Sequence, residues 1–155
     1  MTPALHDGKL KGIACRTFEI TCYMFPLEEW EIEEETDDLD DDSISALVHF
    51  DGAAEGGMQI RVSSELFDSI AENMLGMEEE SQQLKEGALC EIANIICGNT
   101  VPIFAKGDKI CYIRTPEIMM SQQEIDKEFE GMETETAHVH LDEGIAEITI
   151  YYKEV

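Results

Sequence analysis

The chain has 155 residues, of which 35 are acidic and 10 are basic, so its formal charge is −25 when histidine is counted as neutral. This charge excludes most nucleic-acid binders and argues against adsorption to anionic membranes, because both kinds of binding depend on clusters of lysine and arginine. Apolar residues make up 43% of the chain, which is enough to form a hydrophobic core. At this length we expect one domain over residues 1–155.

The first predicted element is an amphipathic helix over Leu5–Phe25, where apolar residues recur at three- and four-residue steps and Pro26 provides a stop. The N-terminus has no apolar stretch behind a basic start, and no apolar run reaches the roughly 18 residues of a membrane span, so we expect neither a signal peptide nor a membrane helix. The five cysteines form no Cys-x-x-Cys pair and are an odd number, which favours a reducing compartment, the cytoplasm.

An acidic segment follows, Glu28–Asp42, with eleven acidic residues in fifteen positions and no basic residue. Mutual repulsion between these charges predicts a flexible, solvated loop. The alternative is an arm that binds a partner, in which Trp30 would be an exposed aromatic anchor.

Two short segments then predict a β-hairpin. Ser43–Phe50 is rich in apolar residues, and Met58–Ser63 alternates apolar with polar residues. The connector between them, residues 51–57, contains three glycines and is typical of a turn.

The rest of the chain alternates between helical and strand patterns. A helix is predicted from Ser63 or Ser64 to Gly76. Helices and hairpins are segregated along the chain, so the predicted class is α+β, with two long helices packed on a largely antiparallel sheet. The later predicted elements are a helix over Gln82–Cys97 that Gly98 closes, a strand over Lys109–Arg114, a loop or weak helix over Ser121–Gly131, and a closing hairpin of Thr134–Leu141 and Ile145–Tyr152.

The helix over Gln82–Cys97 has a distinctive polar face. At 100° per residue, Glu91 and Asn94 lie on the same side, about 4.5 Å apart along the axis. Gly87 and Gly98 fall on that side too, although glycine in a helix costs up to about 1 kcal/mol relative to alanine. The opposite side is the predicted core face, with Leu89, Ile92, Ala93 and Ile96.

Two interpretations of this polar face follow from the periodicity. Another backbone or a bulky surface could come close to it, so that side chains at Gly87 and Gly98 would be in the way. Alternatively, Gly98 is only the C-cap, Gly87 is a local irregularity, and Glu91 and Asn94 belong to an ordinary solvated face.

The sequence of residues 88–99, ALCEIANIICGN, resembles the signature helix of the CheC/CheX/FliY family of bacterial chemotaxis phosphatases. The mark of that helix is Glu-x-x-Asn followed by a glycine, here Glu91 and Asn94. The likeness also includes the first helix and residues 51–57, 63–76 and 107–118, and so most of the chain. CheC and FliY proteins carry two such motifs. This chain is most similar to CheX, because its first helix has Cys22 three residues after Glu19 and offers no second motif.

The resemblance implies a phosphatase that hydrolyses the phospho-aspartate of a CheY-type receiver domain of a response regulator. Glu91 would pair with the receiver's lysine, Asn94 would orient the attacking water, and Gly87 and Gly98 would give the receiver surface room. Both polar side chains should then be exposed, neighbouring and unobstructed. The resemblance further implies a homodimer joined through its β-sheets. No cofactor of its own is expected, since Mg²⁺ would be held by the receiver's acidic residues.

A second hypothesis is a binding module of a chemotaxis or motility system, which docks a receiver through the same helix, or another component through the acidic segment, without hydrolysis. Other chemistries have little support, since no nucleophile elbow or phosphate-binding loop is present. The seven-residue spacing of Cys90 and Cys97 is interpreted as core packing. His138 and His140 share a strand face, but the sequence fixes no further metal ligand beside them.

Overall fold

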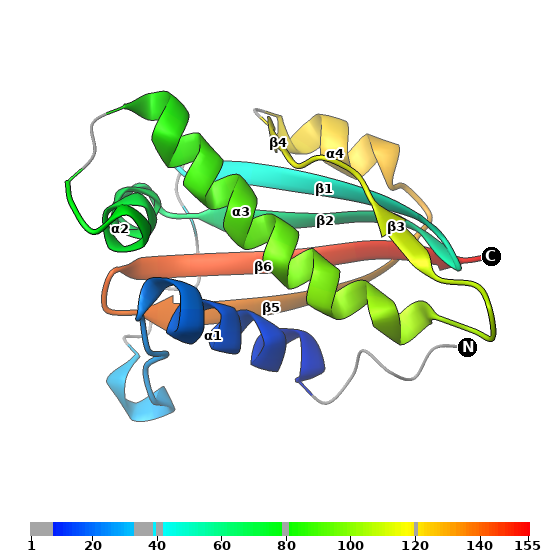
Figure 1. The fold of residues 1–155 in the computed structure, drawn as a ribbon, viewed down its shortest axis with the longest axis horizontal. Helices are drawn as coiled ribbons and strands as arrows, with labels where there is room; N and C mark the ends of the chain where they lie inside the picture. The colour runs from blue at the N-terminus through cyan, green and yellow to red at the C-terminus, as the bar shows by residue number, and fades with distance from the viewer. Residues whose placement is uncertain (1–7, 33–38, 40–41, 79–80, 120) are drawn as a thin grey trace.

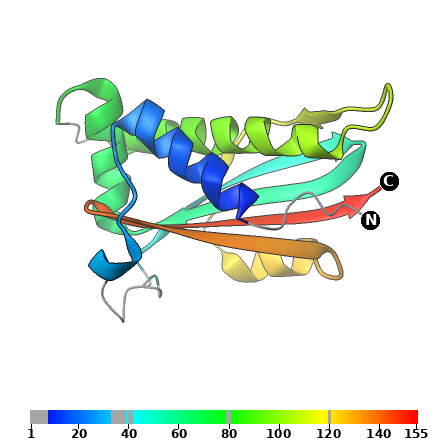
Figure 2. The same ribbon diagram turned by 90° about the horizontal axis from the view of Figure 1, so that it is seen from below.

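A computed structural model describes residues 8–32, 39, 42–78, 81–119 and 121–155. Its centre is a six-stranded antiparallel sheet with three helices on one face and a fourth helix on the other (Figures 1 and 2). The strands are β1 Ile44–Gly52, β2 Ala54–Val62, β3 Cys111–Ile113, β4 Glu117–Met119, β5 Glu133–Leu141 and β6 Gly144–Glu154. The α-helices are α1 Lys9–Cys22, α2 Ser64–Leu75, α3 Gln82–Thr100 and α4 Gln122–Glu128, and short 3₁₀ turns are η2 Glu29–Glu31 and η3 Val101–Phe104.

The strand order is β3-β1-β2-β6-β5, and β4 pairs with β1 along the same edge as β3. Every pairing between these strands is antiparallel. The predicted α+β class and the predicted closing hairpin, β5 with β6, are confirmed. Of the helices on the main face, α1 and α3 are the two predicted long ones, and α2 packs beside them (Figure 1).

The first hairpin is also confirmed, but the prediction that residues 51–57 form its connector is wrong. Strand β1 continues to Gly52 and strand β2 begins at Ala54, so most of these residues are paired. Two of the glycines serve sheet packing instead of a turn. A Cβ atom on Gly56 would collide with the carbonyl of Tyr151 on β6, and one on Gly57 would lie 2.5 Å from the ring of Phe129.

The first helix is shorter than predicted. Helix α1 ends at Cys22, before Pro26, because Tyr23 adopts a left-handed conformation with φ 56° and its N–H donates to the carbonyl of Phe18. The helix begins at Lys9, and residues 5–7 of the prediction lie outside the described residues. Helix α2 begins and ends where predicted, with Gly76 in the left-handed C-terminal position.

Helix α3 is longer than predicted. It continues through Gly98 to Thr100, whose hydroxyl donates to the carbonyl of Ile96 over 2.7 Å, and then tightens into η3, which includes Pro102. The prediction that Gly98 closes the helix is therefore wrong. Residues 82–104 are long and apolar enough to cross a membrane by length and composition, but 50% of their most apolar window is buried in the fold. That burial is typical of the core helix of a globular protein.

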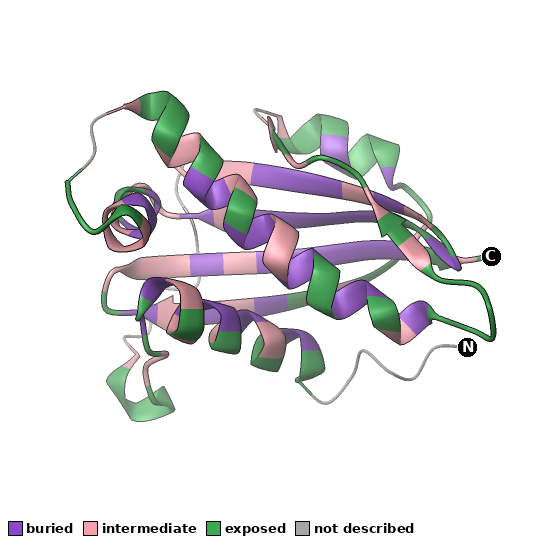
Figure 3. Ribbon diagram, viewed as in Figure 1, coloured by how far each residue is buried: buried purple, intermediate pink, exposed green. Residues whose placement is uncertain are grey.

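The main hydrophobic core lies between the three helices and the sheet, and α3 crosses the middle of it (Figure 3). The predicted core face of α3 is confirmed, because Leu89, Ile92, Ala93 and Ile96 are completely buried. Helix α4 lies in the segment that was predicted as a loop or weak helix. A smaller apolar cluster beneath it consists of Leu47, Ile125, Phe129 and Tyr151.

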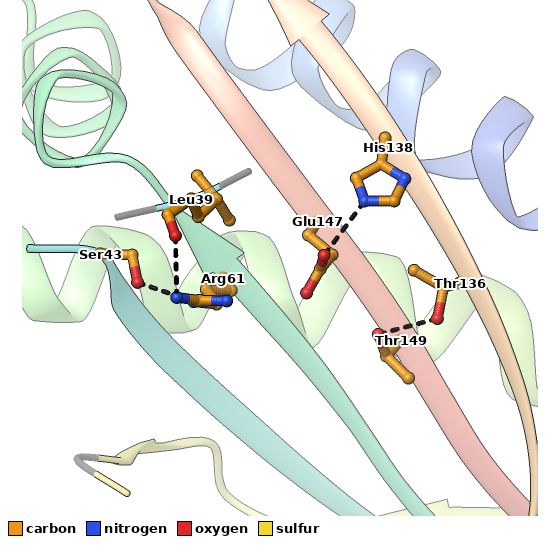
Figure 4. Close-up of polar contacts among 7 residues, drawn as sticks. All are labelled: Leu39, Ser43, Arg61, Thr136, His138, Glu147 and Thr149. Atoms are coloured by element: carbon orange, nitrogen blue, oxygen red, sulfur yellow. Dashed lines mark hydrogen bonds and ion pairs between the residues drawn. The ribbon is translucent and has the colours of Figure 1, made fainter. Parts of the chain in front are cut away.

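Polar side chains pair with one another on the sheet face away from α3 (Figure 4). The Nε2 atom of His138 lies 3.0 Å from Oε2 of Glu147, and Thr136 and Thr149 are joined by a hydrogen bond of 3.1 Å. Within the described part of the chain, no three histidine, cysteine or acidic residues gather as metal ligands.

The acidic segment Glu28–Asp42 is described only in part, since residues 33–38, 40 and 41 lie outside the described residues. Its start forms η2, where the N–H of Glu28 donates to the carboxylate of Glu31 over 2.9 Å. Trp30 in this turn is 83% exposed. Near the end of the segment, the carbonyl of Leu39 accepts from Arg61 on β2 (Figure 4).

Candidate active site

The outward face of α3 carries the polar residues that the helical period placed there. Glu91 is exposed and Asn94 is half-buried, one turn further along. Among the described residues, neither side chain has a hydrogen bond or an ion pair. The rigid support for both is the buried face of the same helix, which fixes its rotation on the sheet. The two groups thus lie one turn apart on the same face, and no described residue binds either side chain.

Glu91 and Asn94 border an open hollow of about 410 Å³. One wall is α3 itself, with Gly87, Cys90, Glu91 and Asn94. The other wall is the short segment 113–116 at the edge of the sheet.

The second wall is a break in the sheet edge. Strands β3 and β4 both pair with β1, but the three residues Arg114, Thr115 and Pro116 lie opposite only two residues of β1, Val48 and His49. Such a bulge bends the edge strand and re-aims its side chains. Proline fits there because it has no N–H to donate to the ladder.

Arg114 was not selected from the sequence, where it is only the last residue of the predicted strand Lys109–Arg114. Its backbone N–H donates to the carbonyl of His49 over 2.8 Å. Its side chain binds Asp51: Nε donates to Oδ2 over 3.1 Å, and Nη2 donates to the same oxygen. Asp51 is 63 residues earlier in the chain. No local sequence signal connects the two residues, because β-pairing alone brings them together.

Packing against the described residues does not explain the two glycines of the polar face. Apart from the backbone of the helix itself, a Cβ atom on Gly87 would meet no atom of the described residues within 4 Å, and one on Gly98 would meet the Cδ1 atom of Ile113, at 3.9 Å. Because α3 continues past Gly98, the interpretation of Gly98 as a C-cap is excluded. Both positions are exposed, so an added methyl group would project from the helix surface.

The Cys90 thiol at the site and the buried thiols of Cys22 and Cys97 are not activated nucleophiles. Burial raises the pKa of the Cys90 thiol at the hollow, and the nearby carboxylates of Glu86 and Glu117 raise it further. Burial also raises the pKa of both Cys22 and Cys97 to about 12. These thiols are protonated at neutral pH, and the interpretation of Cys97 as a core residue is confirmed by its complete burial.

The chemistry available at the hollow is therefore electrostatic positioning. The Glu91 carboxylate can pair with a cation that a partner brings, and the Asn94 amide can both donate and accept hydrogen bonds. The amide has no basic group at neutral pH, so it can orient a water molecule but cannot deprotonate it.

A family profile and several solved structures resemble this chain in sequence pattern or in fold. A family profile described as chemotaxis phosphatase CheX matches residues 44–148, a range that contains Glu91 and Asn94. No curated protein matches the sequence.

Solved structures share the fold at low sequence identity. A CheX from Borrelia burgdorferi, in a complex with CheY, BeF3 and Mg²⁺, superposes with a TM-score of 0.73 at 20% identity, over 94% of this chain and 96% of that one. A CheX from Vibrio vulnificus gives 0.68 at 16% identity, over 97% of each chain. A CheX from Desulfovibrio desulfuricans gives 0.68 at 12% identity, over 93% of this chain and 96% of that one.

Proposed function

The chain belongs to the CheX family of chemotaxis phosphatases, and on that premise we propose that it hydrolyses the phospho-aspartate of a CheY-type receiver domain. One observation carries the proposal: Glu91 and Asn94 stand one turn apart on the outward face of α3, beside an open hollow, and no described residue occupies either side chain. That face can lie across a partner's active site.

In the proposed reaction, α3 positions groups and does little covalent work. Glu91 pairs with the receiver's lysine and so fixes the register of the helix on the receiver. Asn94 enters the receiver pocket and holds a water in line with the phosphorus, as a glutamine does in GTPases. The receiver contributes its own acidic residues and Mg²⁺, and the Mg²⁺ in the Borrelia complex with CheY is consistent with this division.

The rate enhancement asked of these residues is modest. An acyl phosphate hydrolyses readily by itself, so a hundredfold acceleration requires only about 2.7 kcal/mol of barrier reduction. One ion pair that docks the helix and one amide that orients water can supply that amount, because preorganised donors lose little freedom during the reaction.

The proposal extends to the whole chain. We propose that residues 1–155 form one CheX-like domain, since the matched structures cover nearly all of the chain. As in the expectation from the sequence, the protein acts in the cytoplasm as a homodimer joined through its sheets, with one α3 site in each subunit.

The lifetime of a phosphorylated receiver from the same organism tests the proposal. Wild-type protein should shorten the lifetime, and Glu91→Ala and Asn94→Ala should each lose most of that effect. Matched controls are Glu124→Ala and Gln123→Ala on α4, which remove the same side-chain types from exposed positions on the other face of the sheet (Figure 2). Variants at residues 91 and 94 that remain as active as the controls would contradict the assignment.

The second candidate function is a receiver-binding or scaffold module without hydrolysis. The observation that favours it is Trp30, which is 83% exposed among acidic residues and can anchor a partner. Wild-type protein that binds the phosphorylated receiver and leaves its lifetime unchanged would support this candidate against the phosphatase.

A further inference from the structure

The hollow beside Glu91 and Asn94 has one positively charged residue in its walls. Among the described residues that line it, Arg114 is the one cation, and Glu91 is the one acid. The Arg114 side chain is 64% exposed. In a chain with 10 basic residues against 35 acidic ones, few cations are available to bind an anionic group of a partner.

The sheet edge holds Arg114 in place. The bulge opposite Val48 and His49 contains residues 114–116, which line the same hollow as α3, and the backbone N–H of Arg114 donates to the carbonyl of His49. Asp51 then binds the guanidinium through Nε and Nη2. Because a guanidinium has five N–H donors and Asp51 takes two, three remain for another ligand.

Folding stability alone does not explain why Arg114 is paired with Asp51 at this position. Both side chains are substantially exposed, and an exposed ion pair contributes only about 0–1 kcal/mol to stability. What the pair does achieve is orientation, because a guanidinium that is already held loses less conformational entropy when it binds an anion.

We propose that Arg114 is a third receiver-binding residue of this site, which pairs with an anionic oxygen of the docked receiver. This inference rests on the proposed function. Glu91 and Arg114 then place opposite charges at the same hollow: Glu91 binds the receiver's lysine, and Arg114 binds an anionic oxygen of the receiver. The receiver's phosphorylation site is rich in anionic oxygens, and the rest of this chain repels them.

The test measures the dissociation constant of the receiver domain, in its unphosphorylated form and in its form activated by beryllium fluoride. Arg114→Ala should weaken binding by about tenfold or more, which is the usual effect of losing a hydrogen-bonded charge pair. Arg114→Lys should recover part of the loss, because a lysine keeps the charge without the planar fork. The expected loss should shrink as salt concentration rises.

A control and a kinetic readout separate receiver binding from a general charge effect. Lys127→Ala removes one positive charge from α4, on the other face of the sheet, and should change affinity by less than about twofold (Figure 2). In receiver dephosphorylation, Arg114→Ala should raise KM and leave kcat at saturating receiver within a few-fold of wild type.

The outcomes distinguish this inference from the proposed function. Arg114→Ala with wild-type affinity, beside a weakened Glu91→Ala, overturns the role of Arg114 and leaves the phosphatase proposal standing. If wild-type protein binds the receiver but does not hydrolyse it, and Arg114→Ala loses affinity, the role of Arg114 is supported and the phosphatase proposal is contradicted. A loss in both receiver forms assigns the partner oxygen to a receiver carboxylate, and a loss only in the activated form assigns it to the phosphoryl group. Wild-type protein that binds neither form overturns both proposals.

Discussion

Replacing Gly87 by alanine should make the protein more stable and less active. Gly87 lies inside α3 and is exposed, and outside the backbone of the helix no atom of the described residues lies within 4 Å of the position that its Cβ would occupy. The folded protein therefore accommodates the methyl group without strain, and helix propensity should raise the free energy of unfolding by up to about 1 kcal/mol. Thermal or urea denaturation measures this gain.

The activity should change in the opposite direction, because Gly87 lines the hollow on which we propose the receiver docks. A methyl group forced into a packed interface costs on the order of 1–3 kcal/mol. That range corresponds to a loss of about 5- to 150-fold in kcat/KM for receiver dephosphorylation. The assay follows the decay of the phosphorylated receiver at several receiver concentrations.

The matched control is Gly12→Ala. Gly12 is also an exposed glycine inside a helix, α1, and its Cβ position is equally open. This variant should gain similar stability and keep wild-type activity. A Gly87→Ala protein that is stabilised and fully active would refute the idea that this glycine provides clearance for a partner.

Three further predictions concern the fold. Leu89→Ala should lower the free energy of unfolding by about 2–5 kcal/mol in urea denaturation, because Leu89 is fully buried; a loss under about 1 kcal/mol would contradict its core position. Ser81→Ala should cost about 0.5–2 kcal/mol in the same assay, since the Ser81 hydroxyl accepts from the N–H of Leu84 at the start of α3, whereas an unchanged midpoint would argue against that cap. At pH 8, iodoacetamide should label Cys97 only after unfolding, because burial raises the pKa of this thiol to about 12 and keeps it protonated. Mass spectrometry measures the labelling, and rapid labelling of Cys97 in the native protein would contradict the prediction.

The sequence alone determined the features that depend on local periodicity. The 3.6-residue period of α3 placed Glu91 and Asn94 on one face and the core residues on the other, since the rotation per residue is set by the helix itself. Short apolar or alternating segments beside turn residues likewise predicted both hairpins. The resemblance to the CheX family has its contiguous signature motif on the same helix and extends over most of the chain.

Features that depend on distant neighbours were decided only by the tertiary structure. Gly56 and Gly57 resembled turn residues, but β6 and Phe129 occupy the space where their side chains would be. Helix α3 passed its predicted end at Cys97, since Thr100 is buried and bonded within the helix. The second wall of the hollow also had no local signal, because the bulge and the bond between Arg114 and Asp51 exist only once β3 and β4 pair with β1. Pairing between strands is a long-range choice, and a periodic pattern read along the chain contains no record of which edge each strand joins.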